Sequence, residues 1–524
     1  MSGRDTERDA TGLVLMLALA ACVPGQTLSL ASFEFLCASD DDCASTSFCD
    51  ATQVCREGDR LSRGPPLATA APLRGPIGTV LTFTGASLDH VTSVRIGDTS
   101  ALLLHRSQTE LRALVMPGTT TGRIELQAEG QATPLERFVV QAPATASRQA
   151  GPKLVPTDLA GQAEFGAPAV SADGRTVIIG AARDAARQGA AWIFEATDAG
   201  TWAQARPKLV GNDVVGSPEQ GRSVAVSADG RTALVGGRAD GTTGAAWVYS
   251  RDEAGAWAQQ GPKLAGSDAT SSAEYGWSVA LSADGRTAVI GGPNDTGGRG
   301  ASWVFIRDDS GTWRQQGSKL FDPNDTGGHQ GTSVAVSADG TAFIAGAPRD
   351  GDHGTAHVYV RDAAGWVQRG ARLTPNDASG RADFGSAVGI SSDGSTVVVG
   401  GPADRNNVGA VWVFTWSPSG AWVQHGPKLA VSNVSCRFGV SVALSLDGAR
   451  LLAGGDFADV FLGGAWRFSR EGDAWRAVEP MLRGSGAAGP ARQGLVALSP
   501  DEHTVVLGGT FDDGNRGAGW VFTP

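Results

Sequence analysis

The stretch at residues 276–304 decides the fold and reads GWSVALSADGRTAVIGGPNDTGGRGASWV. It holds two short apolar runs on either side of Asp284-Gly285, a dipeptide typical of a hairpin turn. A third run, ending at Trp303 and Val304, follows a glycine-rich loop. Short apolar runs between such turn signals are typical of β-strands. The stretch therefore predicts three strands that pair in sequence order.

The same pattern recurs seven times along the chain. The turn aspartates are spaced by 54 to 56 residues, at Asp173, Asp229, Asp284, Asp339, Asp393, Asp447 and Asp501. Six tryptophans and one histidine mark the third run, at Trp192, Trp247, Trp303, His357, Trp412, Trp466 and Trp520. Another tryptophan opens a fourth run in six units, at Trp202, Trp257, Trp313, Trp366, Trp422 and Trp475. Four strand signals in a repeat of this length predict one propeller blade.

Residues 147–524 are accordingly predicted to form an all-β, seven-bladed β-propeller. The first run of each unit is rich in Ala, Ser and Gly, which suits a crowded inner strand. The last unit lacks its fourth run, whereas residues 148–154 match 258–264, the fourth run of a complete unit. We therefore expect this N-terminal strand to complete the last blade and leave the ring without a long unpaired edge.

The repeats resemble the FG-GAP repeats of the integrin-α-type β-propeller. Phe165-Gly166, Tyr275-Gly276, Phe384-Gly385 and Phe438-Gly439 stand where that family has Phe-Gly, and Gly346-Ala347-Pro348 matches its GAP element. Gln precedes the glycine in the other three units, and no unit keeps the family's calcium loop of alternating aspartates and glycines. The resemblance implies a role in adhesion or interaction.

Residues 64–143 are predicted to form a small β-sandwich. Runs such as 79–84, 91–96 and 123–126 alternate apolar and polar residues between turn signals. The order of those turn signals, including Met116-Pro117-Gly118-Thr119, resembles the immunoglobulin-like IPT/TIG fold. In that family the domain is commonly a spacer or binding module.

The N-terminus reads as an export signal. Residues 13–21 form an apolar run too short to span a bilayer. The run ends in Leu19-Ala20-Ala21-Cys22, which resembles the lipobox of bacterial lipoproteins. The resemblance implies a lipoprotein signal peptide at 1–21, lipid attachment at Cys22, and anchoring in the cell envelope at the outer membrane or cell surface. The preceding residues are net negative, unlike most signal peptides, so an ordinary cleaved signal or a buried apolar stretch is the alternative.

Residues 22–63 are predicted to form a cysteine-rich stalk. Its four cysteines recur every six residues, at Cys37, Cys43, Cys49 and Cys55. In an exported, polar segment they predict two disulfides, in any of the three pairings. A zinc site is the rival interpretation, although zinc ligands usually come as close CxxC pairs. Cys436 has no evident partner and is expected to be a free thiol in a loop.

The net charge of the chain limits which kinds of partner it can bind. The chain has 524 residues and a net charge of −11, which argues against nucleic acid or an anionic membrane surface as its main partner. Membrane contact is expected through the lipid anchor only. The chain is long enough to fold alone, and we expect a monomer.

Aspartates gather in two sets of loops that should open on one face of the propeller. The loop before the first strand carries Asp158, Asp213, Asp268, Asp325 and Asp377. The loop between the second and third strands carries Asp184, Asp240, Asp295, Asp350, Asp404 and Asp512. They either cap their own loops by hydrogen bonding to backbone N–H groups, or form a mouth that binds calcium or a cationic ligand.

No sequence motif has the full set of residues that a known catalytic site requires. The Gly-x-Ser patterns lie in predicted inner strands without an accompanying His and Asp, and His353 and His357 lack the HExxH context of a zinc site. We therefore predict a non-enzymatic binding or adhesion protein, without catalytic residues, that recognises protein or glycan through the propeller. A hydrolase or lyase with its site in the central funnel and a structural surface component are the alternatives.

Overall fold

A computed structural model describes residues 67–524, except 199, 206, 326 and 432–434, together with the backbone of 47–49 and 55–57. The chain divides into a unit at Met1–Pro65 and a unit at Pro66–Pro524. The predicted signal peptide, Cys22, Cys37 and Cys43 lie outside the described residues. Within the described part, no helix has the length and hydropathy needed to cross a bilayer.

The first unit contributes one described element, a two-stranded hairpin. Strands β1 (Ser47–Cys49) and β2 (Cys55–Glu57) pair antiparallel. Cys49 and Cys55 are directly opposite each other in the register.

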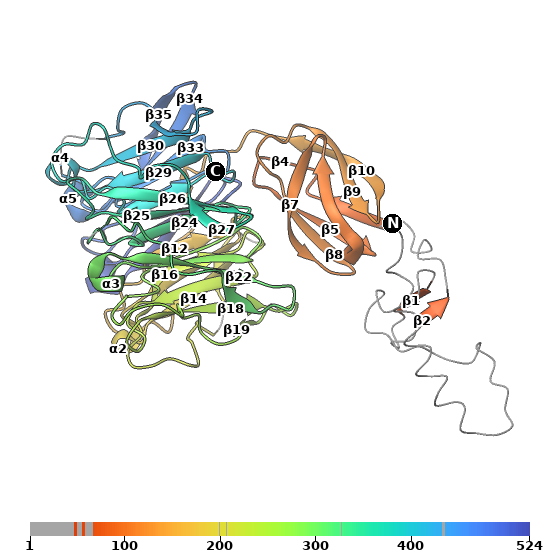
Figure 1. The fold of residues 1–524 in the computed structure, drawn as a ribbon, viewed down its shortest axis with the longest axis horizontal. Coiled ribbons are helices and arrows are strands. Elements are labelled where there is room, and N and C mark those ends of the chain that lie inside the picture. The colour runs from red at the N-terminus through yellow and green to blue at the C-terminus, as the bar shows by residue number, and fades with distance from the viewer. Residues whose placement is uncertain are drawn as a thin grey trace, which may run out of the picture. The chain divides into compact units, whose positions relative to one another are not determined.

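The second unit begins with the β-sandwich, drawn in orange in Figure 1. Its strands are β3 (Leu67–Ala71), β4 (Arg74–Gly75), β5 (Val80–Ala86), β6 (Val91–Ile96), β7 (Thr99–Arg106), β8 (Glu110–Leu114), β9 (Gly122–Ala128) and β10 (Gln131–Val140), with a short 3₁₀ turn, η4 (Leu88–His90). They are hydrogen-bonded in the order β3-β5-β8-β7-β6-β9-β10-β4. The alternation seen in the sequence places Leu81, Phe83, Ile124 and Leu126 in one core with no exposed surface.

Seven four-stranded sheets follow, which confirms the propeller. Blades 1 to 3 consist of β12 (Ala167–Val170), β13 (Thr176–Ala181), β14 (Ala190–Ala196) and β15 (Trp202–Gln204); β16 (Gln220–Val226), β17 (Thr232–Gly237), β18 (Ala245–Arg251) and β19 (Trp257–Gln259); and β20 (Ser278–Leu281), β21 (Thr287–Gly292), β22 (Ala301–Arg307) and β23 (Trp313–Gln315).

Blades 4 to 6 repeat the pattern. They consist of β24 (Ser333–Val336), β25 (Ala342–Ala347), β26 (Thr355–Asp362) and β27 (Gly365–Gln368); β28 (Ala387–Ile390), β29 (Thr396–Gly401), β30 (Ala410–Trp416) and β31 (Trp422–Gln424); and β32 (Ser441–Leu444), β33 (Arg450–Gly455), β34 (Gly464–Glu471) and β35 (Ala474–Leu482). In each blade the second strand is almost entirely buried between its neighbours.

Blade 7 is closed by the N-terminal strand, as predicted. It consists of β36 (Leu495–Leu498), β37 (Val505–Gly509), β38 (Ala518–Thr523) and β11 (Arg148–Gln149). Arg148 pairs with Thr523, and Leu154 forms a further bridge to Gly519, as Leu209 does to Ala191 in blade 1. The ring is therefore held shut by backbone hydrogen bonds between the two ends of the propeller sequence.

The turn between the first and second strands has the same chemistry in every blade. In blade 1, the Ser171 hydroxyl donates to Asp173 at 2.6 Å and accepts from the amide of Thr176 at 3.0 Å. Gly174 has a φ of 66°, a conformation that glycine adopts without steric cost. Backbone hydrogen bonds also join successive turns, as from Ala172 N to Ala228 O at 2.9 Å.

The sandwich packs over this end of the propeller. Leu114, Leu102, Leu104 and Met116 of the sandwich form one apolar cluster with the turn residues Ala172, Ala228, Ala283 and Leu446. Arg112 donates to the carbonyl of Asp229 at 3.3 Å, and Gly78 lies so close to Pro500 that a Cβ would overlap the carbonyl oxygen. We call this end the covered mouth and the opposite end, where each inner strand begins, the open mouth.

Five four-residue turns lie at the open mouth, between the second and third strands of their blades. They are α2 (Asp184–Arg187), α3 (Asp295–Gly298), α4 (Asp404–Asn407), α5 (Ala458–Phe461) and α6 (Asp512–Asn515). Their second and third residues have positive φ angles, so the backbone is left-handed there. The sequence predicts only plain loops at these segments.

Candidate functional site

The two predicted sets of aspartate loops do meet at the open mouth. In blade 3, for example, Asp295 of α3 accepts a hydrogen bond from the amide of Thr270, two residues after Asp268, at 2.8 Å. The sequence therefore correctly placed both loops on one face. It did not indicate what the carboxylates contact.

The aspartates before the first strand bind the tryptophan of their own blade. The indole Nε1 atoms of Trp192, Trp247, Trp303 and Trp412 donate at 2.7–2.8 Å to Asp158, Asp213, Asp268 and Asp377, respectively. Each of these carboxylates also accepts from a glutamine of the fourth strand. Burial would raise their pKa, but these hydrogen bonds outweigh it and lower the pKa of all four.

The aspartates between the second and third strands are buried ion-pair partners. Asp184, Asp240, Asp295, Asp404 and Asp512 pair with Lys208, Lys263, Lys319, Lys428 and Lys153, respectively, and Asp350 pairs with Arg372. Their side chains are at most 10% exposed. Lys153 follows the closing strand β11 of blade 7, so the same clamp also joins the two ends of the ring.

The contacts of these aspartates with tryptophan, lysine and arginine argue against calcium binding at the open mouth. Ten of the eleven predicted aspartates engage a tryptophan, lysine or arginine of the chain itself, so a cation would have to displace that partner. Among the described residues, no group of three or more His, Cys, Asp or Glu side chains is arranged to hold a metal. The geometry is that of a structural clamp repeated around the ring.

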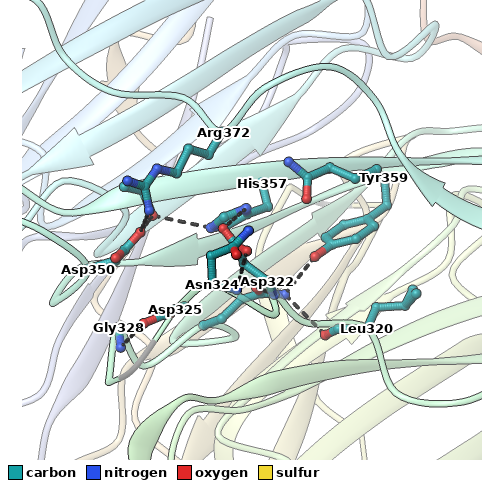
Figure 2. A network of polar contacts seen from close by, with 12 residues as sticks. Leu320, Asp322, Asn324, Asp325, Gly328, Asp350, His357, Tyr359 and Arg372 are labelled. Carbon is teal, nitrogen blue, oxygen red and sulfur yellow. Dashed lines mark hydrogen bonds and ion pairs between the residues drawn. The ribbon is translucent and has the colours of Figure 1, made fainter.

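Blade 4 departs from the clamp, as Figure 2 shows. His357 replaces the tryptophan and is fully buried. Its Nε2 lies 3.2 Å from the Thr355 hydroxyl, whereas its Nδ1 and Asp325 Oδ2 have no hydrogen-bond partner among the described residues. Burial lowers the pKa of His357, against the nearby carboxylates led by Asp322, so the ring is neutral at pH 7. His353 bonds instead to the carbonyl of Gly380, at 2.8 Å, and does not join this network.

The residue beside the tryptophan differs between blades. In blades 2, 3 and 7 a glycine packs against the tryptophan, and a Cβ on Gly211, Gly266 or Gly484 would lie 2.0–2.7 Å from the indole. Asp322 occupies this position in blade 4. Blades 1, 5 and 6 keep the tryptophan beside Pro156, Pro375 and Val431, so the size of this neighbour does not by itself explain the exchange.

A second set of residues at the open mouth was not predicted. One titratable residue immediately precedes the inner-strand Phe, Tyr or Gln of every blade, at Glu164, Glu219, Glu274, His329, Asp383, Arg437 and Arg492. All seven have φ between 51° and 59°, which is uncommon for residues other than glycine. We call them the mouth ring.

The left-handed backbone of the mouth ring has a structural cause. The amide of Glu219 donates to the carbonyl of Arg187 in the preceding blade at 3.0 Å, and Arg492 donates in the same way to Phe461 at 2.9 Å. This contact fixes the backbone between adjacent blades. Glycine or asparagine would satisfy the same conformation, so the backbone alone does not account for seven titratable side chains.

Charges in the mouth ring are sorted by blade. In blades 1 to 3, Glu219 is 3% exposed and pairs with Arg187 and Arg238, and Arg238 also binds Glu274 at 2.6 Å. Arg238 and Arg222 contact the ring of Trp277, with guanidinium-to-centroid distances of 5.0 and 4.4 Å. Arg222 has no ion-pair partner among the described residues, and its pKa is lowered by desolvation and by Arg238.

The side formed by blades 6 and 7 is basic and aromatic. Arg437 pairs with Asp456 at 3.3 Å and lies over Phe457. Arg492 lies 4.1 Å from the ring centroid of Phe511. Cys436, at the entry to this region, is buried, and its thiol donates to the carbonyl of Val408 at 3.3 Å.

An alignment of the seven units against one another could have revealed the mouth ring. The Trp, the turn Asp and the loop Asp repeat almost unchanged, whereas the position before the Phe-Gly, Tyr-Gly or Gln-Gly pair is always titratable but changes sign. The side-chain partners could not be foreseen, because they come from the neighbouring blade.

Comparison with known families agrees with this architecture. The FG-GAP repeat family matches residues 151–194, 257–305 and 366–414, and the IPT/TIG domain family matches residues 68–138. Each FG-GAP match runs from the fourth strand of one blade to the third strand of the next. No curated protein matches the sequence.

Solved structures with a similar fold are distant. A candidate 6-phosphogluconolactonase from Bacteroides uniformis is 15% identical, with a TM-score of 0.43, over 70% of this chain and 94% of its own. The periplasmic gluconolactonase of Pseudomonas aeruginosa is 16% identical, with a TM-score of 0.41, over 70% and 94%. A protein of unknown function from Desulfotomaculum acetoxidans is 14% identical, with a TM-score of 0.41, over 70% and 92%. These similarities carry no conclusion about activity. The family matches and the observed sheets together show that this chain joins an IPT/TIG domain to FG-GAP repeats that form a seven-bladed β-propeller.

Proposed function

We propose that this protein is a non-enzymatic binding protein of the bacterial cell envelope, exported and anchored by lipid at Cys22, that recognises a protein or glycan at the open mouth of its propeller. The observation that carries the proposal is the asymmetry of the two mouths. Apolar side chains of the sandwich pack over one mouth, whereas the other carries the mouth ring, which differs from blade to blade.

Divergence between repeats supports a binding role for the open mouth. Residues that build a repeat fold are copied from unit to unit, because every unit has the same packing to satisfy. The clamp aspartates and tryptophans follow that rule. The mouth ring and its neighbours Arg222 and Trp277 do not, which is expected of positions that contact a ligand without internal symmetry.

The binding proposal is tested on a glycan array and on a panel of envelope and host-surface proteins, with the full chain. We expect at least one ligand whose affinity falls tenfold or more in Arg222→Ala. Arg286→Ala is the matched control, because Arg286 pairs with an exposed aspartate at the other end of its blade and should leave binding unchanged. Equal loss in both variants would count against the open mouth.

Two further claims of the proposal, that the protein is not an enzyme and that it is anchored by lipid, are tested separately. A panel of ester and glycoside substrates should give no turnover; turnover abolished by one substitution at the open mouth would favour a hydrolase or lyase. Mass spectrometry of protein extracted from membranes should find the mature N-terminus at a lipid-modified Cys22. An unmodified N-terminus elsewhere would exclude the anchor.

A further inference from the structure

The turn α5 in blade 6 exposes two large apolar side chains at the open mouth. Val460 is 82% exposed and Phe461 is 41% exposed. They adjoin Arg492 of the mouth ring, whose amide binds the carbonyl of Phe461. We call Val460, Phe461 and Arg492 the blade 6 patch.

The backbone of the blade 6 patch is unfavourable for its residues. Val460 and Phe461 have φ angles of 55° and 65°, and a β-branched residue is a rare outlier in this left-handed region. The same two positions hold Gly297-Gly298 in α3, Asn406-Asn407 in α4 and Gly514-Asn515 in α6, and Ala186-Arg187 in α2. Four other turns thus form without a large apolar residue at these two positions, so the fold does not require Val and Phe in α5. Strained, exposed residues of this kind indicate a functional site.

The guanidinium of Arg492 is held in place but has no acceptor. It lies 4.1, 5.0 and 5.5 Å from the ring centroids of Phe511, Phe457 and Phe461, respectively. Cation–π contacts with three rings fix its position without using its N–H donors. Among the described residues its side chain forms no hydrogen bond or ion pair. Its charge does act on the Asp456 carboxylate, which pairs with Arg437, and both arginines oppose the rise that burial causes in the pKa of Asp456. Its donors are therefore available to an incoming carboxylate.

We propose that the blade 6 patch docks a protein segment that presents a carboxylate beside an apolar side chain. The carboxylate binds Arg492, and the apolar side chain packs on Val460 and Phe461. A protein is favoured over a glycan because aromatic residues and arginine are enriched at the centres of protein interfaces, and Phe461 and Arg492 supply both. The inference rests on the proposed function, because it names the partner class of the open mouth.

A random peptide library displayed on phage is the first probe, with the full chain immobilised. We expect enriched peptides to hold Asp, Glu or a terminal carboxylate within two residues of Leu, Ile or Phe. The affinities of the corresponding synthetic peptides are then measured by fluorescence anisotropy. Binding should fall at least tenfold in Arg492→Gln, and likewise in the double variant Val460→Gly, Phe461→Asn.

The double variant separates binding from folding, because it installs the residues that α6 already has. Gly and Asn adopt left-handed φ angles readily, so its melting temperature should equal or exceed that of the parent. Ala186→Gly in α2 is the matched control. It should leave peptide affinity unchanged and give a similar small rise in melting temperature. A melting temperature lowered by several degrees in the double variant would show that Val460 and Phe461 are packing residues.

Three further outcomes would overturn the inference. They are a library without enrichment, peptides that bind the double variant as well as the parent, and acidic oligosaccharides binding in place of peptides. A ligand that depends on Arg222 but not on the blade 6 patch would refute this inference and leave the proposed function standing. If no ligand depends on either, both fail.

Discussion

At the residue scale, the hydrogen bond from tryptophan Nε1 to a loop carboxylate makes stability depend on pH. The pKa of Asp268 is lowered in the fold, against burial, by hydrogen bonds from Lys319 N, Trp303 and Gln315. A carboxyl with a lowered folded pKa stabilises the fold above its unfolded pKa of about 4, and this contribution is lost as pH falls through the folded value. Asp158, Asp213 and Asp377 act in the same direction.

We therefore expect the urea midpoint to fall steeply below about pH 4, and Asp268→Asn to reduce that slope. At neutral pH the substitution should cost about 1–3 kcal/mol, because the amide cannot replace every hydrogen bond of the carboxylate. Asp309→Asn is the control, since Asp309 is 91% exposed. Equal slopes in both variants would contradict the clamp.

His357 gives a second residue-scale prediction. His357→Trp should destabilise the protein by about 1–3 kcal/mol, because His357 is fully buried beside Asp322 and the larger indole would overpack that site. Adding Asp322→Gly should recover part of the loss, and a double-mutant cycle measures the coupling. Additive effects would mean that the two residues do not compete for space.

The sequence predicted the positions of these side chains in the repeat but not their hydrogen-bond partners. The tryptophans and turn aspartates follow the repeat and could be assigned to blades from spacing alone. The bond from Trp303 to Asp268 joins residues 35 apart through a loop whose path spacing does not define. The same limit concealed the mouth ring, because its contacts cross from one blade to the next.

At the element scale, closure by β11 governs the stability of the ring. Deleting Ser147–Val155 should lower the melting temperature by many degrees, because it exposes the edge of β38 and leaves Asp512 buried without Lys153. Lys208→Ala, which breaks the same clamp in blade 1 without opening the ring, is the comparison. A deletion variant that melts within a degree or two of the parent would disprove closure as a source of stability.

The hairpin of β1 and β2 makes a prediction about disulfides that spacing alone left open. Residues opposite each other in an antiparallel pair have Cα atoms about 4.5–5.5 Å apart, within the range of a disulfide. We expect Cys49 to bond Cys55, which leaves Cys37 for Cys43. Non-reducing digestion at aspartate and after Phe48 places the four cysteines on separate peptides, and mass spectrometry identifies the linked peptides. A peptide that links Cys37 to Cys49 or Cys55 would rule this pairing out.

Strands were predictable where hydrophobic alternation and glycine turns agree, and the N-terminal closing strand could be found by matching residues 148–154 to 258–264. The left-handed turns were not. Their residues range from Gly-Gly to Val-Phe, so no composition marks them. Their shape follows from hydrogen bonds to the next blade, which local sequence does not encode.

At the scale of the whole molecule, the sandwich and the propeller act as one folded unit through the covered mouth. Leu104→Glu should separate them, because it places an unpaired carboxylate in the apolar cluster with Ala172 and Ala228. Small-angle scattering should show a larger radius of gyration, and proteolysis of the linker at 141–147 should become faster. Val139→Glu is the control, since Val139 is already 43% exposed. An unchanged radius would mean that the linker alone positions the sandwich.

This covered mouth could not be predicted from the sequence. The apolar residues that form it belong to the alternating pattern of the sandwich on one side and to the turns of several blades on the other. The apolar residues of the sandwich and those of the turns are each ordinary for the segment that carries them, so neither set marks an interface. Their complementarity appears only when the ring brings the turns together, so the sequence alone left both mouths of the propeller equally available.

The closure of blade 7 also determines when the protein can finish folding. A chain is synthesised with its N-terminus first, so β11 emerges before any blade and has no partner until β38 follows it. Pairing between such distant segments is intrinsically slow and leaves strand edges exposed in the meantime. Closure of the ring therefore waits for β38, and a premature stop before Ala518 would yield a chain with most of its blades and no means of closing the ring.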